Sequence, residues 1–499
     1  MSSPRSRRRV LPAVAVVAAL GLAACGTQES DQAIKNAAGG GSVTSLTGST
    51  SDAGSSTGAV AGGSSGAVSS GATGSGSTGG AITGGSAGGG TTGTSGSTRS
   101  SGTTSTSGTT GTSGTSGPAA TTGSTDGPAT GSTITVAIVG TFSGPVGALV
   151  KDTTTGARIW AAYANAHGGI NGHKVNLVIG DDGGDPARYN SLVQQFVEQD
   201  HAIAFIYTTL GFAPNGNNSY LDSKKIYTFG TEGGLDNAYK DPYEVTAVPT
   251  GHTYADAMIY ALSKVAKPKG ATKLAEYACS DFSLCDNFDS EWSNPKALAA
   301  TGFTLVDRGR PSLTQPDFTT QCINAKNAGA TTIIAALDTA SLRRFAGDCA
   351  RQNYHPLMGS ADVVVTPSIA DDSNMEGFVI GSKFASFRAS TVPGIKKLEQ
   401  ALAQYAPGQK NSGGIAYGWL LGTFFAHAGK SLPANPTAAD VGNGIYALKG
   451  DDLEGMTYPL TFTRGQSSPN KLCFGVTVVH AKAFQQGPGS ALQCSSRPS

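Results

Sequence analysis

Polar side chains that could bind a small charged molecule follow two β-rich runs of the 499-residue sequence. Thr208 and Thr209 end one run, and Gly230, Thr231 and Glu232 follow the next. Hydroxyl and backbone N–H groups donate hydrogen bonds to carboxylates, whereas an acidic side chain accepts them from an ammonium group. Ligands of open α/β sheets bind beyond the carboxyl ends of the strands. We therefore expect these residues to lie at a ligand site, with helix capping as the alternative for each threonine.

The same rule selects further loops, which we expect at 142–149, 208–212, 230–234, 280–284, 338–341 and 360–363. Asp338 opens one of them and is a candidate ligand residue, with helix capping again as the alternative. Tyr277 and Phe282 could line a pocket for an apolar side chain, although Tyr277 is equally plausible as a core residue. The ligand site is thus expected to draw on several loops that are far apart in the sequence.

Six cysteines lie in the part of the chain that can fold, and their even number favours disulfides in an exported protein. They are Cys279, Cys285, Cys322, Cys349, Cys473 and Cys494. Sequence alone allows 15 pairings, and we favour pairing each cysteine with its nearest neighbour, because each bond then stays within one local unit. No CxxC motif occurs and the seven histidines are scattered, so we expect no metal and no cofactor.

The framework for these loops is an alternation of β-rich runs and helical stretches, which implies parallel sheets covered by helices. We expect strands at 134–140, 175–179, 202–207, 226–230, 273–278, 304–307, 331–337, 378–381, 458–462 and 474–479. We expect helices at 152–167, 185–199, 287–300, 317–328, 342–353, 393–405, 415–428 and 438–448. A chain of this length favours two similar α/β lobes over one sheet.

Residues 39–132 have a different composition, because 74 of these 94 residues are Gly, Ser or Thr. The first aromatic residue of the chain is Phe142. Such a segment cannot bury enough apolar surface to fold, so we expect a disordered linker. Its GxGxxG and GxSxG matches are accidents of composition. After residue 132 the chain carries 29 basic and 30 acidic residues, a balance that gives no electrostatic basis for nucleic-acid binding.

The N-terminus has the pattern of an export signal. Four arginines precede an apolar run at 10–22, which is short for a membrane span. The run ends in Leu22-Ala23-Ala24-Cys25, which resembles the bacterial lipobox. The resemblance implies cleavage before Cys25, acylation of its sulfur and anchoring to the outer face of the bacterial cell membrane. The alternative is an ordinary secretory signal with an incidental cysteine.

Several segments, in this order, resemble the Leu/Ile/Val-type substrate-binding proteins of ABC transporters. They are Ile134-Thr-Val-Ala-Ile-Val-Gly-Thr-Phe-Ser-Gly-Pro145, Gly156-Ala157-Arg158, Gly168-Gly-Ile-Asn-Gly172, Asp181-Asp182, Asp185-Pro186, Gly230-Thr-Glu-Gly-Gly234, Asp317-Phe318 and Met375-Glu-Gly-Phe378. The resemblance covers about residues 134–480. It implies the type I periplasmic-binding-protein fold, an α/β fold of two Rossmann-like lobes with parallel sheets, three hinge crossings and a ligand cleft.

The resemblance divides the chain into a signal peptide at 1–24, a linker at 25–132 and a binding domain at 133–494. The first lobe would comprise about 133–249 and 383–456, and the second about 250–382 and 457–494. Asp362 lies near the place where the family sets an acid against the ligand's ammonium. The implied function is capture of an amino acid or similar small polar solute for an ABC permease, without enzymatic activity.

The sequence departs from the family pattern where Leu210-Gly211-Phe212 replaces a hydroxyl run, and where Leu149 and Asp338 replace aromatic residues. A different amino acid, an amide, an aromatic acid or another small polar solute therefore stays open as the ligand. A sensor of the same fold without transport is the first alternative function. An exported enzyme is the second, although outside the linker the sequence has no GxSxG, HExxH or P-loop motif.

Overall fold

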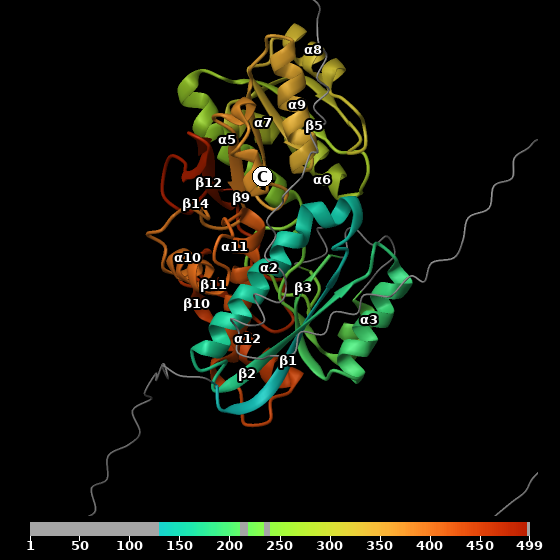
Figure 1. Ribbon diagram of the computed structural model, residues 1–499, viewed down its shortest axis with the longest axis vertical. Coiled ribbons are helices and arrows are strands. Elements are labelled where there is room, and N and C mark those ends of the chain that lie inside the picture. Colours follow the sequence, from blue (N-terminus) through green and yellow to red (C-terminus); the bar gives the residue numbers. More distant parts are fainter. Residues whose placement is uncertain (1–128, 210–217, 234–239, 497–499) are drawn as a thin grey trace, which may run out of the picture. The chain divides into compact units, whose positions relative to one another are not determined.

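The computed structural model describes residues 129–209, 218–233 and 240–496, which belong to one compact unit. Their strands form two main sheets and one small pair, with helices on the faces of the main sheets (Figure 1). This is the predicted α/β class. The predicted signal peptide, the acylation site Cys25 and the linker up to residue 128 lie outside the described residues.

The first sheet is entirely parallel, in the order β2-β1-β3-β4. Its strands are β1 (Gly131–Gly140), β2 (His173–Asp181), β3 (Ala202–Thr208) and β4 (Tyr227–Thr228). Alternate residues of β1 enter two different cores, because successive side chains of a strand point to opposite faces. Val136 and Ile138 belong to the larger core, and Ala137 and Val139 to the smaller one.

Helices cover both faces of this sheet, and Figure 1 shows α2 and α3 on opposite faces. These helices are α2 (Gly144–Ala166), α3 (Pro186–Glu198), α4 (Ser219–Lys224), α10 (Pro393–Tyr405), α11 (Gly413–Ala428) and α12 (Ala438–Ala447). The start of α3 is as predicted: Asp185 caps the helix by accepting a 2.7 Å hydrogen bond from the Ala187 N–H, and Pro186 occupies the first turn.

The second sheet has the order β13-β12-β9-β8-β7-β5-β6, and β14 also pairs with β12. Its strands are β5 (Lys273–Ala278), β6 (Thr304–Gly309), β7 (Thr332–Ala336), β8 (Leu357–Ala361), β9 (Val379–Ser382), β12 (Cys473–His480), β13 (Ala483–Gln486) and β14 (Gln493–Cys494). Its helices are α5 (His252–Ala266), α6 (Leu284–Trp292), α7 (Pro295–Thr301), α8 (Thr319–Asn327) and α9 (Thr339–Arg351). The chain passes from the first sheet to the second before α5, returns after β9, and passes again before β12.

The structure differs from the predicted elements in several places. Helices α4 and α5 and strands β8, β10 (Lys449–Asp451), β13 and β14 were not predicted, and α2 begins before the helix expected at 152–167. The helix expected at 287–300 is two helices, because Asn294 caps a new helix whose first residue is Pro295. The strand expected at 458–462 is short, and its β11 (Leu460–Thr461) pairs with β10 (Lys449–Asp451) rather than with the second sheet. Finally, β12 runs antiparallel to β9, so the second sheet is mixed rather than purely parallel.

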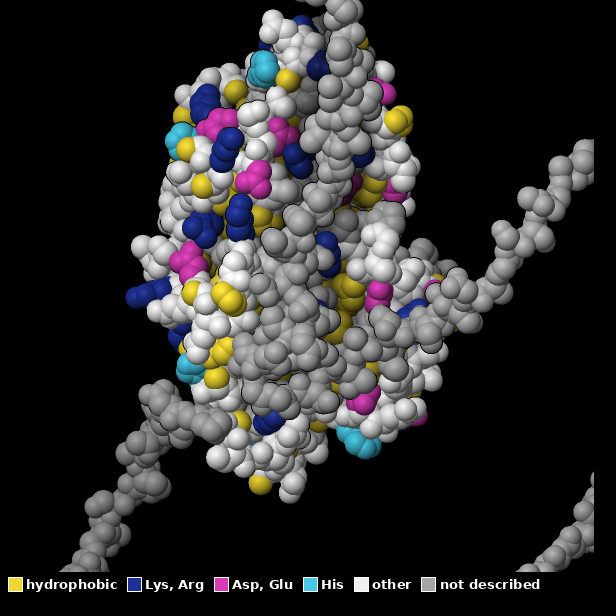
Figure 2. Space-filling view, in the orientation of Figure 1, with side chains coloured by type: hydrophobic (Ala, Val, Ile, Leu, Met, Phe, Trp, Pro, Cys, Tyr) yellow, Lys and Arg dark blue, Asp and Glu magenta, His cyan; other side chains and the backbone are white. Residues whose placement is uncertain are grey.

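Three disulfides join the pairs that we favoured from the sequence: Cys279–Cys285, Cys322–Cys349 and Cys473–Cys494. The first lies directly after β5, the second joins α8 to α9, and the third joins β12 to β14. Figure 2 shows Lys and Arg side chains interspersed with Asp and Glu side chains over the described part of one face. That face therefore carries no extended field of one sign.

Candidate functional site

An apolar cavity of about 40 Å³ lies where loops from both sheets meet. Its walls are almost entirely aliphatic and aromatic: Leu149, Val150, Glu232, Tyr254, Cys279, Phe282, Leu284, Phe288, Leu313, Ala336, Leu337, Asp338, Ala361, Val363 and Val364. A water needs roughly 10–15 Å³ of such space, so the cavity has room for a few waters only. A solute of several carbon atoms therefore enters only if the walls move apart.

The position of the cavity agrees with the rule that selected the loops. Most of its second-sheet walls lie at or after the carboxyl ends of β5, β7 and β8, with Leu313 after β6 and Tyr254 on α5. Its first-sheet walls come from α2 and from Glu232 after β4. Five of the six loops that the rule selected contribute at least one residue to the walls of the cavity. The exception is the loop at 208–212, of which residues 210–212 lie outside the described residues.

The predicted hydroxyl donors are close together but point into the protein. Thr208, Thr209 and Thr231 are all buried. The Thr209 hydroxyl accepts a 2.8 Å hydrogen bond from the backbone N–H of Thr141, and the Thr231 hydroxyl accepts one of 3.3 Å from the N–H of Gly233. The hydroxyls of Thr209 and Thr231 hold the loops in place, and none of the three threonines lines the cavity.

Gly230 is needed for close packing between the sheet and helix α11. Its carbonyl accepts a 3.1 Å hydrogen bond from the Thr208 N–H. A Cβ atom at Gly230 would lie 2.6 Å from a Leu421 methyl carbon and 2.9 Å from the Tyr417 hydroxyl. A side chain at Gly230 would therefore force the side chains of Leu421 and Tyr417 on α11 to shift.

The candidates of the second lobe have different surroundings. Asp338 lines the cavity and also caps α9, where its carboxylate accepts hydrogen bonds from the N–H groups of Ala340 at 2.9 Å and Ser341 at 3.1 Å. Phe282 lines the cavity as expected. Tyr277 does not: it is buried in β5, and its hydroxyl donates to the carboxylate of Asp307. The structure therefore places Tyr277 in the core, which was the alternative for this residue.

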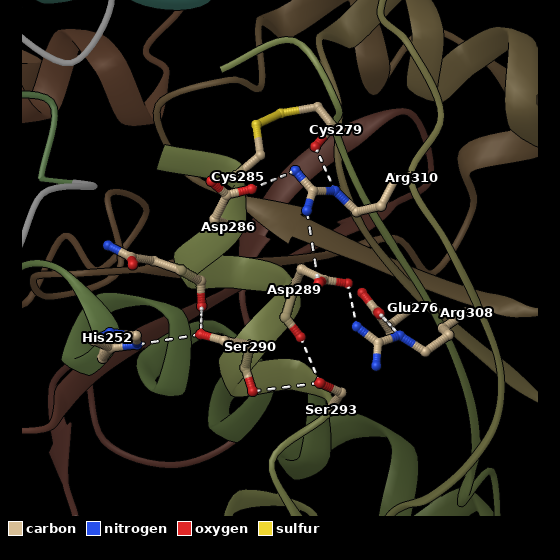
Figure 3. Close-up of polar contacts among 11 residues, drawn as sticks. His252, Glu276, Cys279, Cys285, Asp286, Asp289, Ser290, Ser293, Arg308 and Arg310 are labelled. Atoms are coloured by element: carbon tan, nitrogen blue, oxygen red, sulfur yellow. Dashed lines mark hydrogen bonds and ion pairs between the residues drawn. A yellow bond between two sulfur atoms is a disulfide. The ribbon is translucent and has the colours of Figure 1, made fainter. Parts of the chain in front are cut away.

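The loop that carries Phe282 is fixed at both ends, as Figure 3 shows. The Cys279–Cys285 disulfide closes the loop. The Arg310 guanidinium donates to the Cys279 carbonyl and to the Asp286 carboxylate, both at 2.8 Å. These contacts restrict the backbone on either side of Phe282, so this wall of the cavity is preorganised.

A second arginine extends this network to the buried acid Glu276 of β5. Arg308 donates to Glu276 at 3.1 Å and to Asp289 at 2.6 Å (Figure 3). Burial, together with the neighbouring Asp289, raises the pKa of Glu276 to about 8. Asp289 keeps its charge, because although burial opposes it, hydrogen bonding from Arg308 lowers its pKa.

A buried lysine beside the cavity escaped the sequence predictions. Lys383 follows β9 and is fully buried. Its ammonium donates a 2.8 Å hydrogen bond to the Glu232 carbonyl and lies 3.8 Å from the centre of the Tyr417 ring and 4.7 Å from that of the Tyr254 ring. Asp362, the acid expected to face a ligand ammonium, accepts a 2.6 Å hydrogen bond from the Tyr254 hydroxyl. We call these five residues the internal ammonium site.

Burial disfavours the charged forms of both Lys383 and Asp362. Burial lowers the pKa of Lys383 to about 8, and the attraction of Asp362 and Glu232 limits the fall. Burial raises the pKa of Asp362, whereas the Lys383 ammonium and the Tyr254 hydroxyl act in the opposite direction. Tyr417 is held by a 2.7 Å hydrogen bond from its hydroxyl to the Thr231 carbonyl. The buried cation thus contacts a backbone carbonyl and two aromatic rings, and two acids nearby attract it electrostatically.

One signal in the sequence could have indicated Lys383. A lysine directly after a buried strand lies on the edge of the sheet where ligands bind, and the expected strand at 378–381 places it there. Its partners could not be foreseen, because Glu232 is 151 residues away in the sequence.

Among the described residues, no group of three or more His, Cys, Asp or Glu side chains could hold a metal ion. Within 129–209, 218–233 and 240–496, no helix is long and apolar enough to cross a membrane.

Comparison with known proteins identifies the class. The model of a periplasmic binding protein family matches residues 133–483, so the chain belongs to this family. The fold is the type I periplasmic-binding-protein fold. A search of curated proteins finds no match.

Solved structures share this fold at low sequence identity. A branched-chain amino acid ABC transporter protein from Thermus thermophilus with bound valine is 17% identical, with a TM-score of 0.61, over 73% of this chain and 97% of that one. A fatty acid ABC transporter substrate-binding protein from Thermomonospora curvata is 18% identical, with a TM-score of 0.59, over 75% and 95%. A substrate-binding periplasmic protein from Ralstonia solanacearum is 16% identical, with a TM-score of 0.61, over 71% and 100%.

Proposed function

We propose that this protein is a lipid-anchored, extracytoplasmic substrate-binding protein that captures a small solute with an apolar body and delivers it to an ABC permease. The observation that carries the proposal is the apolar cavity at the carboxyl ends of β5, β7 and β8, closed on its other side by Leu149, Val150 and Glu232. Walls from two sheets joined by three chain crossings can separate and close around a solute.

The proposed solute class is bounded by the walls of the cavity. The only acidic groups among the lining residues are Glu232 and Asp338, and Asp338 is engaged as a helix cap. The sequence favoured an amino acid or similar small polar solute, and the cavity supports the apolar part of such a molecule. Valine, which is bound to one structural neighbour, and fatty acids, for which another is named, both combine an apolar body with a carboxylate.

The proposed mechanism of delivery uses the N-terminal region. Residues 1–24 would direct export, and acylated Cys25 would hold the protein at the membrane. The linker at 25–132 would then let the binding domain move, since a flexible coil with the 94-residue length of 39–132 has an r.m.s. reach of roughly 50–60 Å.

A thermal-shift screen of residues 26–499 against amino acids, amides, and branched, aromatic and fatty acids tests the capture step. A ligand at 100 Kd that binds only the folded state adds about 2.7 kcal/mol of stability. Val364→Trp should abolish the shift by filling the cavity, whereas Ile323→Trp, at a side chain 40% exposed on α8, should not. A screen in which no solute raises the transition would refute the proposal.

Uptake of the identified solute by cells tests the delivery step. Cells that carry Val364→Trp should lose uptake, and Cys25→Ala should release the protein from the membrane. Normal uptake with the Val364→Trp protein would exclude delivery and favour the sensor alternative.

A further inference from the structure

The internal ammonium site has the composition of a site for a ligand's amine. Two aromatic rings, a backbone carbonyl and two carboxylates are the groups that recognise ammonium ions in proteins. Here the ammonium belongs to the protein: Lys383 has no exposed surface, and its nitrogen lies over the rings of Tyr417 and Tyr254.

The elements around the Lys383 ammonium come from both sheets. Glu232 follows β4 of the first sheet and Tyr417 lies on α11, whereas Tyr254 lies on α5 and Asp362 follows β8 of the second sheet. The internal ammonium site is therefore formed by elements of both sheets, as the apolar cavity is.

The ammonium site and the cavity share two walls. Glu232 and Tyr254 line the cavity, while the Glu232 carbonyl and the Tyr254 ring contact the Lys383 ammonium. A solute whose apolar body fills the cavity would therefore bring an amine close to a charge that is already present. Like charges that lie close together repel strongly where water is excluded.

We propose that Lys383 is a specificity-determining residue that occupies the amine position of the site and excludes solutes with a free amine. This rests on the proposed function and narrows its solute class. The solute is a small molecule with an apolar body and no ammonium group, such as a branched carboxylic acid or its amide. The assignment of Asp362 as the partner of a ligand's ammonium is replaced: its cationic neighbour is Lys383.

Four probes with similar carbon skeletons test this on residues 26–499: leucine, 3-methylbutylamine, 4-methylpentanoate and 4-methylpentanamide. We expect at least one of the two amine-free probes to bind the wild-type protein at least tenfold more tightly than leucine or 3-methylbutylamine. Lys383→Met removes the charge but keeps a side chain of similar length. In this variant, the ratio of the Kd of leucine or 3-methylbutylamine to the Kd of the amine-free probe should fall at least tenfold. Lys471→Met is the matched control, because Lys471 also lies over a tyrosine ring, at 5.6 Å from Tyr458, but is exposed.

Wild-type protein that binds leucine more tightly than the amine-free probes would overturn the inference while leaving solute capture intact. An unchanged preference in Lys383→Met would also overturn it. The wild-type comparison does not depend on whether a variant folds.

A second variant tests the ammonium site without any solute of the cavity. Lys383→Ala vacates the position of the ammonium, so propylammonium chloride should raise its melting temperature by several degrees more than tetramethylammonium chloride at equal concentration. Wild-type protein should respond equally to both salts. Rescue without binding of any solute would support the ammonium site and contradict the proposed function, whereas equal effects of the two salts on Lys383→Ala would contradict the inference.

Discussion

The coupling between Asp362 and Lys383 gives the sharpest prediction about the stability of the fold. Asp362→Asn keeps the shape of the side chain but weakens the charged acceptor of the Tyr254 hydroxyl and leaves the Lys383 ammonium with one acid fewer. A buried hydrogen bond to a charged group contributes roughly 1.5–3 kcal/mol, and Asp362→Asn also removes the attraction between this carboxylate and the nearby Lys383 ammonium. We therefore expect Asp362→Asn to lower the free energy of unfolding by about 3 kcal/mol.

The expected change in melting temperature follows from the size of the folded part. With an unfolding entropy of about 2.1 cal/mol/K per residue, a domain of roughly 360 residues loses about 4 °C for 3 kcal/mol. Lys383→Met should cost a similar amount. The double variant should cost much less than the sum, with a coupling energy of about 2 kcal/mol, because it leaves neither an uncompensated cation nor the charge of Asp362.

Denaturant unfolding of the wild-type protein, the two single variants and the double variant measures this coupling. The matched control is the same cycle at Asp371 and Lys410, a pair at 3.4 Å whose side chains are 57% and 68% exposed, where we expect no measurable coupling. Single-variant effects at Asp362 and Lys383 that add to within about 0.5 kcal/mol would refute the electrostatic account of the internal ammonium site.

Three further predictions concern the loops around the cavity. Because the folded pKa of Glu276 is raised to about 8 from an ordinary 4.5, its contribution to stability should fall as pH rises between these values, at up to roughly 1.4 kcal/mol per pH unit. Glu276→Gln should flatten the pH profile of the melting temperature, and an unchanged profile would contradict this. Replacing Cys279 and Cys285 by serine opens a disulfide of sequence separation 6 and should cost about 2 kcal/mol while weakening solute binding several-fold through the Phe282 loop, as calorimetry would show; unaltered affinity would mean that the loop is held without the bond. Gly230→Ala should destabilise the protein by about 1–3 kcal/mol by overpacking, and a variant that melts at the wild-type temperature would count against the close approach of α11.

Much of the fold could be predicted because local sequence encodes it. The Asp185-Pro186 start of α3 shows this, since a capping side chain and a proline act within one turn. The direction of β12 could not be predicted, because an alternation of apolar residues is the same for parallel and antiparallel strands. The break between α6 and α7 could have been predicted from Pro295, because proline interrupts a helix or occupies its first turn.

The candidate site was predicted at the level of loops rather than of side chains. The strand-end rule located Phe282 and Glu232 at the cavity, because it depends only on topology. It could not tell that the hydroxyl of Thr209 would bond to the neighbouring strand end, or that Asp338 would cap its own helix. The position of Lys383 depends on packing between segments far apart in the chain, which a single sequence does not encode in a local pattern.

Saturation-transfer NMR of residues 26–499 with a mixture of branched acids, amides, amino acids and fatty acids tests the central claim most directly. The account predicts that the apolar protons of at least one probe receive saturation from the wild-type protein and that Val364→Trp removes the transfer. Transfer that persists in Val364→Trp, or the lack of any transfer from the wild-type protein, would contradict capture of a solute in this cavity.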